Sequence, residues 1–136
     1  MSHYIRCKTL TLEEAFKYIG RRKKHTFGEK RVGTKSNRLK CFKFHGVVCK
    51  HCGAVGVFFA IEKARDASDC WHLNLYAYNA NNEEVLMTAD HVIPRSRGGC
   101  NELENLQTLC TDCNFKKDNK LEEKCCGPNL NIIIKK

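Results

Sequence analysis

Residues 90–114 read DHVIPRSRGGCNELENLQTLCTDCN, and this stretch holds more reactive side chains than any other part of the chain. It contains a histidine suited to proton transfer, oxygen ligands that hard metal ions prefer, and two thiols in a Cys-x-x-Cys pair. A second pair of this kind, Cys49 and Cys52, lies far upstream. Two such pairs can share one tetrahedral zinc ion, because each pair places two thiolates on one side of a tight turn. The sequence therefore predicts a structural Zn²⁺ site formed by Cys49, Cys52, Cys110 and Cys113.

The rest of this stretch resembles the HNH nucleases, also known as the His-Me finger or ββα-metal family. The resemblance rests on the elements DHxxP, GG, NL and LCxxCN and a following lysine, which occur in this order from Asp90 to Lys117. It implies an α+β fold with a small zinc-stapled ββα-metal core, to which the sequence adds further antiparallel strands and an N-terminal helix. It also implies a metal-dependent DNA endonuclease that hydrolyses phosphodiester bonds and leaves 5′-phosphate and 3′-hydroxyl ends.

The resemblance assigns roles to individual residues. His91 would be the general base that takes a proton from water, since an imidazole is partly neutral at working pH. Asn105 would hold the active-site geometry, with its amide fixing the tautomer of the ring. Asp90 and Asn114 would bind one catalytic Mg²⁺ or Mn²⁺ ion through oxygen atoms. Asn114 stands where many members of the family carry histidine.

The basic residues form two groups of candidate DNA contacts. The first group lies near the motif and could hold phosphates beside the scissile bond, although each residue could equally be a solvated charge; it comprises Arg95, Arg97 and Lys117. The second group is a run of four cations in the N-terminal segment: Arg21, Arg22, Lys23 and Lys24. That run would also complement the C-terminal dipole of a preceding helix, so both interpretations stay open.

The charge is distributed unevenly along the chain. Residues 1–50 hold 14 Lys/Arg against three Asp/Glu, whereas residues 51–136 hold 10 against 12. This asymmetry is typical of a polyanion-binding segment joined to a more neutral core, and the expected partner is double-stranded DNA. A solubilising segment is the alternative explanation.

Local patterns suggest a division of the chain at residues 40 and 127. Residues 1–40 are expected to form a basic helix and an arm that extend the DNA contact, residues 41–127 the nuclease domain with its cysteine pairs, and residues 128–136 a tail. Thr11 and Glu14 form a capping box before a helix that reaches Ile19. The polar segment 25–40 reads as a loop or flexible arm.

Alternating and short apolar runs predict the strands, and helix-start signals predict the last helix. The expected strands are Leu39–Phe44, Val47–Val48, Val55–Ala60, Trp71–Tyr78, Glu84–Ala89 and Leu106–Leu109. The expected helix begins at Thr111–Asp112 and runs towards Glu123, where Gly127–Pro128 would stop it. Ile132–Ile134 could add a short strand.

Several general expectations complete the interpretation. No apolar run is long enough to span a membrane and the N-terminus lacks an apolar signal region, so we expect a cytoplasmic protein, in the host cell if it is phage-encoded. The size resembles that of free-standing HNH nucleases of phages and mobile elements; a monomer and a homodimer are both compatible with the sequence. The remaining cysteines are expected to be reduced and structural: Cys7, Cys41, Cys70, Cys100, Cys125 and Cys126.

A second class of function also accounts for much of the sequence. A zinc-stapled DNA-binding module without catalysis, such as a regulator, would explain both the cysteines and the basic segment. It gives no reason for Asp90, His91, Asn105 and Asn114 to occur together.

Overall fold

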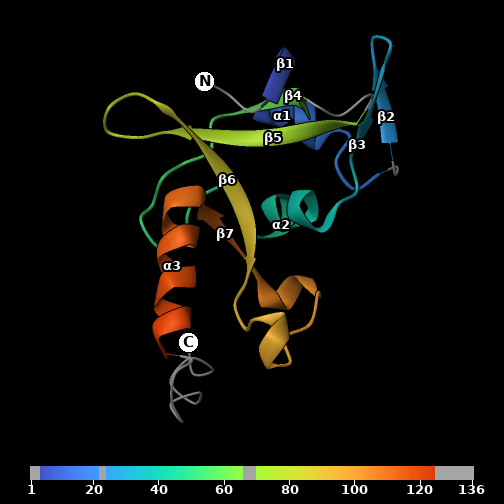
Figure 1. Ribbon diagram of the computed structural model, residues 1–136. Coiled ribbons are helices and arrows are strands. Elements are labelled where there is room, and N and C mark those ends of the chain that lie inside the picture. The colour runs from blue at the N-terminus through green and yellow to red at the C-terminus, as the bar shows by residue number, and fades with distance from the viewer. Residues whose placement is uncertain (1–3, 22–23, 66–69, 125–136) are drawn as a thin grey trace.

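The computed structural model describes residues 4–21, 24–65 and 70–124, with the side chains of the last helix described as far as Lys117 (Figure 1). It contains a mixed α+β arrangement in which strands predominate. The elements are β1 (Tyr4–Thr11), α1 (Leu12–Phe16), β2 (Lys24–Phe27), β3 (Lys30–Gly33), α2 (Asn37–His45), β4 (Phe58–Ala64), β5 (Trp71–Tyr78), β6 (Glu84–His91), the 3₁₀ turns η1 (Arg95–Arg97) and η2 (Leu103–Asn105), β7 (Leu106–Cys110) and α3 (Thr111–Lys124).

The described strands form one seven-stranded sheet built around β5. Strand β4 pairs with one edge of β5 along most of its length, and β1 pairs with the outer edge of β4. The other edge of β5 is divided between two strands: β3 pairs with its beginning in parallel, and β6 pairs with its end in antiparallel. Strand β6 then continues past β5 and pairs with β7, so it links the main sheet to the C-terminal part of the fold.

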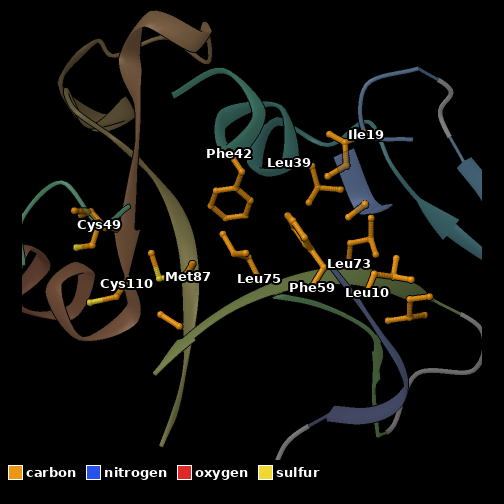
Figure 2. Close-up of a cluster of buried hydrophobic side chains, with 14 of the residues drawn as sticks. Leu10, Ile19, Leu39, Phe42, Cys49, Phe59, Leu73, Leu75, Met87 and Cys110 are labelled. Carbon is orange, nitrogen blue, oxygen red and sulfur yellow. The ribbon is translucent and has the colours of Figure 1, made fainter. Parts of the chain in front are cut away.

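The hydrophobic core lies between one face of the sheet and the helix α2. Side chains alternate across a strand, so Phe59 and Ile61 of β4 share a face with Leu73 and Leu75 of β5, and all four are fully buried. Phe42 of α2 packs towards them from the opposite side (Figure 2). The cluster continues through Met87 to Cys49 and Cys110 at its other end, so the cysteine pairs are part of the same core (Figure 2).

The prediction for Leu39–Phe44 is wrong, because these residues belong to the helix α2 rather than to a strand. Ser36 caps the helix, and its hydroxyl accepts a hydrogen bond of 3.3 Å from the backbone N–H of Leu39. Leu39 and Phe42 lie three residues apart and are buried on one side of the helix. A short apolar run of this length fits either element by sequence pattern alone.

The N-terminal segment is more ordered than predicted. The arm expected over residues 25–40 is instead the hairpin β2–β3 followed by the start of α2. Strand β1 was not expected either; as an edge strand it buries only Leu10, so its sequence lacks strong alternation. The capping box at Thr11 and Glu14 is confirmed, although α1 ends at Phe16 and the chain continues as a turn to Ile19.

The later elements follow the predictions more closely. Strands β5, β6 and β7 and the helix α3 occur where the sequence placed them, and β4 begins three residues later than expected. In the expected Val47–Val48 strand, only a single bridge between Val48 and Val55 is present. The predicted features at Gly127–Pro128 and Ile132–Ile134 lie outside the described residues.

Residues on both sides of the proposed boundary at residue 40 pair within the same sheet, because β1 joins β4 and β3 joins β5. The division into functional segments stays a prediction. Within the described ranges, no helix combines the length and the apolar character needed to cross a membrane.

Replacing Phe59 by Ala should lower the free energy of unfolding by about 3–5 kcal/mol, because it opens a cavity in the densest part of the core. Phe44→Ala is the matched control, since Phe44 is 64% exposed whereas Phe59 is 0% exposed. The control should change stability by no more than about 0.5 kcal/mol. Urea unfolding followed by tryptophan fluorescence measures both, and equal losses would contradict the core described above.

Candidate functional site

Four cysteine thiols meet where two distant segments of the chain come together. Cys49 and Cys52 lie in the turn after α2, Cys110 ends β7, and Cys113 lies in the first turn of α3. Their sulfur atoms all lie within 4.8 Å of one another. Cys52 is exposed and the other three are buried. The turn closes through a hydrogen bond of 3.0 Å from the N–H of Gly53, whose positive φ of 82° favours glycine, to the Cys49 carbonyl.

Backbone N–H groups point at two of these sulfurs. The N–H of Cys52 lies 3.5 Å from the Cys49 sulfur, and the N–H of Cys113 lies 3.4 Å from the Cys110 sulfur. Burial acts against ionisation of Cys49, but backbone N–H donors around its sulfur outweigh it and lower its pKa to about 6. Burial raises the pKa of both Cys110 and Cys113.

The lowered pKa of Cys49 favours one thiolate in the cluster. The raised pKa of Cys110 and Cys113 makes further thiolates among these sulfurs unfavourable unless a cation is bound. Four thiolates at this spacing suit a tetrahedral metal ion, and the cluster can hold one. His51 lies between the two cysteines of the upstream pair. Its side chain is exposed, yet its Nδ1 lies 3.5 Å from the Cys113 sulfur.

Strand β6 and helix α3 pack against each other along a contact that we call the seam. Two predicted metal ligands lie there, one on each element. Thr88 and Asp90 point to one side of β6, and Asn114 and Lys117 lie one helical turn apart on α3. The Asn114 amide donates a hydrogen bond of 3.0 Å to the Thr88 hydroxyl. The Lys117 ammonium bonds to the Asp90 carboxylate. Asp90 and Asn114 therefore lie at the same seam, each in contact with a residue of the opposite element.

His91 ends β6, and its ring contacts a different segment. Its Nε2 lies 2.8 Å from Oδ1 of Asn101, in the loop between β6 and β7. Because Oδ1 is an acceptor, Nε2 carries the proton in this contact and Nδ1 is left as the basic nitrogen. The backbone carbonyl of His91 accepts a hydrogen bond of 2.6 Å from Lys117, so one lysine joins both Asp90 and His91 to α3.

Asn105 supports the loop rather than the imidazole. Its Oδ1 accepts from the N–H of Ile93 at 2.9 Å, and its Nδ2 donates to the carbonyls of Ile93 at 3.0 Å and Cys100 at 2.8 Å. Both N–H groups of the amide are thereby used. Neither remains for the predicted role of Asn105, which was to fix the His91 tautomer. Asn105 thus acts on the position of the backbone, and the ring has Asn101 as its partner.

The loop also depends on a close backbone approach at Gly99. A Cβ atom at this position would lie 1.7 Å from the carbonyl oxygen of Ile93 and 2.9 Å from Nδ2 of Asn105. The Gly99 N–H in turn donates to the Pro94 carbonyl at 3.0 Å. The second glycine of the Gly98–Gly99 pair therefore allows the loop to close against Asn105.

The predicted phosphate contacts are distributed over three places. Arg95 and Arg97 lie in η1, on the same loop as Asn101. Lys117 lies in the seam, where it contacts Asp90, and its phosphate role stays a prediction. Arg21 donates to the Lys17 carbonyl at 3.4 Å, which agrees with its alternative role at the end of α1. Lys24 begins β2 and is exposed; Arg22 and Lys23 lie outside the described residues.

Sequence reasoning missed three residues that contact the site. Gln107 donates to Asp90 at 3.3 Å from the neighbouring strand, and the register of a β6–β7 hairpin could have indicated it. Thr88 precedes Asp90 by two residues, so strand alternation could also have indicated it. Nothing in the sequence distinguished Asn101 from the other polar residues of its loop.

Comparison with known proteins matches part of the chain to a family. Residues 78–120 match the family model described as HNH endonuclease. The match begins at the end of β5 and takes in β6, β7 and most of α3, so it contains the seam, the loop and one cysteine pair. The predicted relationship to the HNH family is thus confirmed for this segment. Neither a curated protein nor a solved structure matches the chain.

Replacing Cys110 and Cys113 together by Ser should remove the bound metal, because only two of the four thiolates remain. Metal analysis of the purified protein should find about one equivalent in the wild type and almost none in the double variant. The exposed Cys100→Ser variant is the control and should keep its metal. A metal content unaffected by the double substitution would contradict the four-sulfur site.

Gly99→Ala should lower the free energy of unfolding by about 1–3 kcal/mol, because the added methyl group overlaps the Ile93 carbonyl. Gly33→Ala is the control, since nothing lies within 4 Å of a Cβ there and its φ is not positive. Urea unfolding measures the difference. A Gly99→Ala protein as stable as the control would mean that the loop does not close against Asn105.

Proposed function

We propose that the protein is a metal-dependent DNA endonuclease that hydrolyses phosphodiester bonds with a histidine general base. The observation that carries this proposal is that Asp90 and Asn114 both lie at the β6–α3 seam, with His91 following Asp90 in the chain. These three residues come from the segment that matches the HNH endonuclease family. A seam of oxygen donors beside an imidazole supplies the groups that metal-assisted hydrolysis of a phosphodiester requires.

The two proposed metal sites have different chemistry. Cys49, Cys52, Cys110 and Cys113 form a closed set of soft ligands, which suits a structural Zn²⁺ without an open position for substrate. Asp90 and Asn114 offer hard oxygen ligands, which suit Mg²⁺ or Mn²⁺. When bound there, such an ion supplies charge stabilisation for the phosphate and the leaving oxygen.

The protein's own residues account for the proton transfer. Asn101 holds the His91 ring through Nε2, which leaves Nδ1 available to accept a proton from the attacking water. Asn105 and Gly99 fix the loop that carries Asn101. Arg95 and Arg97 lie on the same loop and would bind phosphates of the cleaved strand.

We infer that the substrate is double-stranded DNA and that the products carry 5′-phosphate and 3′-hydroxyl ends. One such site cuts one strand, so a single copy would nick the duplex and two copies would cut both strands. The net charge of +9 supports a polyanionic substrate.

One observation favours the alternative of a non-catalytic DNA-binding module. The Lys117 ammonium forms an ion pair with the carboxylate of Asp90, which is the group proposed to bind the metal. Both contacts of Asp90, with Lys117 and with Gln107, use the same oxygen, Oδ2. A catalytic ion would therefore share Asp90 with a positive charge, which weakens cation binding. Activity measurements separate the two functions.

His91→Ala should reduce cleavage of supercoiled plasmid in Mg²⁺ or Mn²⁺ by about 10²–10⁴-fold, because the general base is lost. Binding to the same DNA should persist, since the imidazole is one side chain of a protein with a net charge of +9. The control is His72→Ala, on an exposed position of β5 that lies away from the seam. Agarose gels measure nicking, and a gel-shift assay measures binding.

Two outcomes would overturn the proposal. Full cleavage by the His91→Ala protein would reject the assigned base. Plasmid that stays intact with the wild-type protein in both metal ions, while the DNA is still bound, would favour the non-catalytic module.

A further inference from the structure

The hairpin β2–β3 is a short two-stranded ribbon with two different faces. A two-residue turn at Gly28 and Glu29 joins the strands, and Gly28 has a φ of 64°, as a type II′ turn requires at this position. The register places Thr26 opposite Arg31 and His25 opposite Val32. Side chains alternate along each strand, so these two pairs point to opposite faces of the ribbon.

The inner face anchors the ribbon to the rest of the protein. Val32 is fully buried, and the His25 ring stacks on Tyr18 with centroids 3.9 Å apart. Phe27 meets the same tyrosine edge-on at 5.3 Å. The backbone of β3 also pairs with Trp71 and His72 at the start of β5. These contacts hold the ribbon in a fixed orientation relative to the sheet.

The outer face carries hydrogen-bond donors and positive charge. This face carries the exposed side chains of Lys24, Thr26 and Arg31, two of which are positively charged. Gly33 lies opposite Lys24, and the space where a Cβ would sit at Gly33 contains no atom within 4 Å. The ribbon's acidic residue, Glu29, lies in the turn rather than on this face.

From this arrangement we infer that the β2–β3 hairpin is a second DNA-contact element, which enters the major groove of duplex DNA with Lys24, Thr26 and Arg31 facing the groove. The major groove admits a two-stranded β-ribbon, and lysine and arginine neutralise the phosphates on its walls. The inference rests on the proposed function for its choice of DNA as ligand. Its surface is separate from the β6–α3 seam.

The position of the hairpin sets the size of the DNA that could reach both surfaces. The hairpin joins β5 at Trp71, whereas β6 joins β5 as far as Tyr78. Trp71 and Tyr78 are about 23 Å apart along the strand. From Glu84, opposite Tyr78, β6 runs antiparallel to β5, leaves it after Leu86 and pairs with β7 as far as His91. Figure 1 shows the hairpin and α3 on opposite sides of the molecule. A duplex of about three helical turns is therefore a suitable probe.

The test measures binding of a fluorescent duplex of about 30 base pairs to the full chain in the His91→Ala background, in which cleavage is expected to be strongly reduced. Lys24→Gln/Arg31→Gln should weaken binding by roughly tenfold or more, and the slope of log affinity against log salt should fall by about 2. The matched control is Lys8→Gln/Lys17→Gln, which removes the same charge from exposed positions outside the hairpin. The control should change affinity by less than about threefold.

A second pair of variants tests the outer face of the hairpin without removing a cation. Thr26→Glu places a negative charge on the outer face and should weaken duplex binding strongly, whereas Thr9→Glu, on exposed β1, should not. Circular dichroism and urea unfolding verify that each variant is folded. Equal losses in the hairpin and control variants would overturn the inference, as would equal losses on a single-stranded probe of the same length.

The outcome can be distinguished from a failure of the proposed function. If the wild-type protein binds duplex through the hairpin but leaves plasmid intact, the nuclease function is rejected and the hairpin contact with DNA is retained. If the wild type cleaves plasmid and the hairpin variants bind as tightly as the controls, the hairpin contact is rejected and the nuclease function is retained.

Discussion

The four-sulfur cluster is the constraint on which the C-terminal half of the structure depends. It ties the turn at Cys49–Cys52 to the junction of β7 and α3, and Asn114 follows the last of these cysteines directly. Backbone contacts reinforce the tie, since the Lys50 N–H donates to the Thr108 carbonyl at 2.9 Å. The cluster thereby holds the first turn of α3, and the contacts of Asn114 with Thr88 and of Lys117 with Asp90 hold the same helix against β6.

Much of the C-terminal half could be predicted from sequence, because its signals are local. Strand β5 alternates, α3 begins at Thr111 with helix-favouring residues, and the motif has fixed spacings. The N-terminal half could not, because one of its short apolar runs fits a strand or a helix by pattern alone and its strands depend on distant partners. The apolar run at Leu39–Phe44 became a helix through its cap at Ser36, and β1 became a strand because β4 offers it an edge.

The site shows the same limit at the level of side chains. The motif identified Asp90, His91 and Asn114, but it carries no information on which neighbours they contact. Asn101, close to the motif but without a pattern of its own, holds the imidazole. Lys117 was expected to be either a phosphate contact or a solvated charge, and no sequence pattern indicated its contact with a carboxylate, which arises because α3 places its ammonium at the seam. Such partners follow from the packing of α3 on β6, which no local pattern records.

The pairing of segments far apart in the chain has a consequence for the folding rate. The contact between Cys52 and Cys110 spans 58 residues, and that between Arg6 and Glu62 spans 56. Closing a loop of this size costs roughly 4 kcal/mol of chain entropy before any contact repays it. Folds dominated by such pairings reach the native state in milliseconds to seconds rather than microseconds. The two cysteine pairs consequently stay apart until the chain between them has closed.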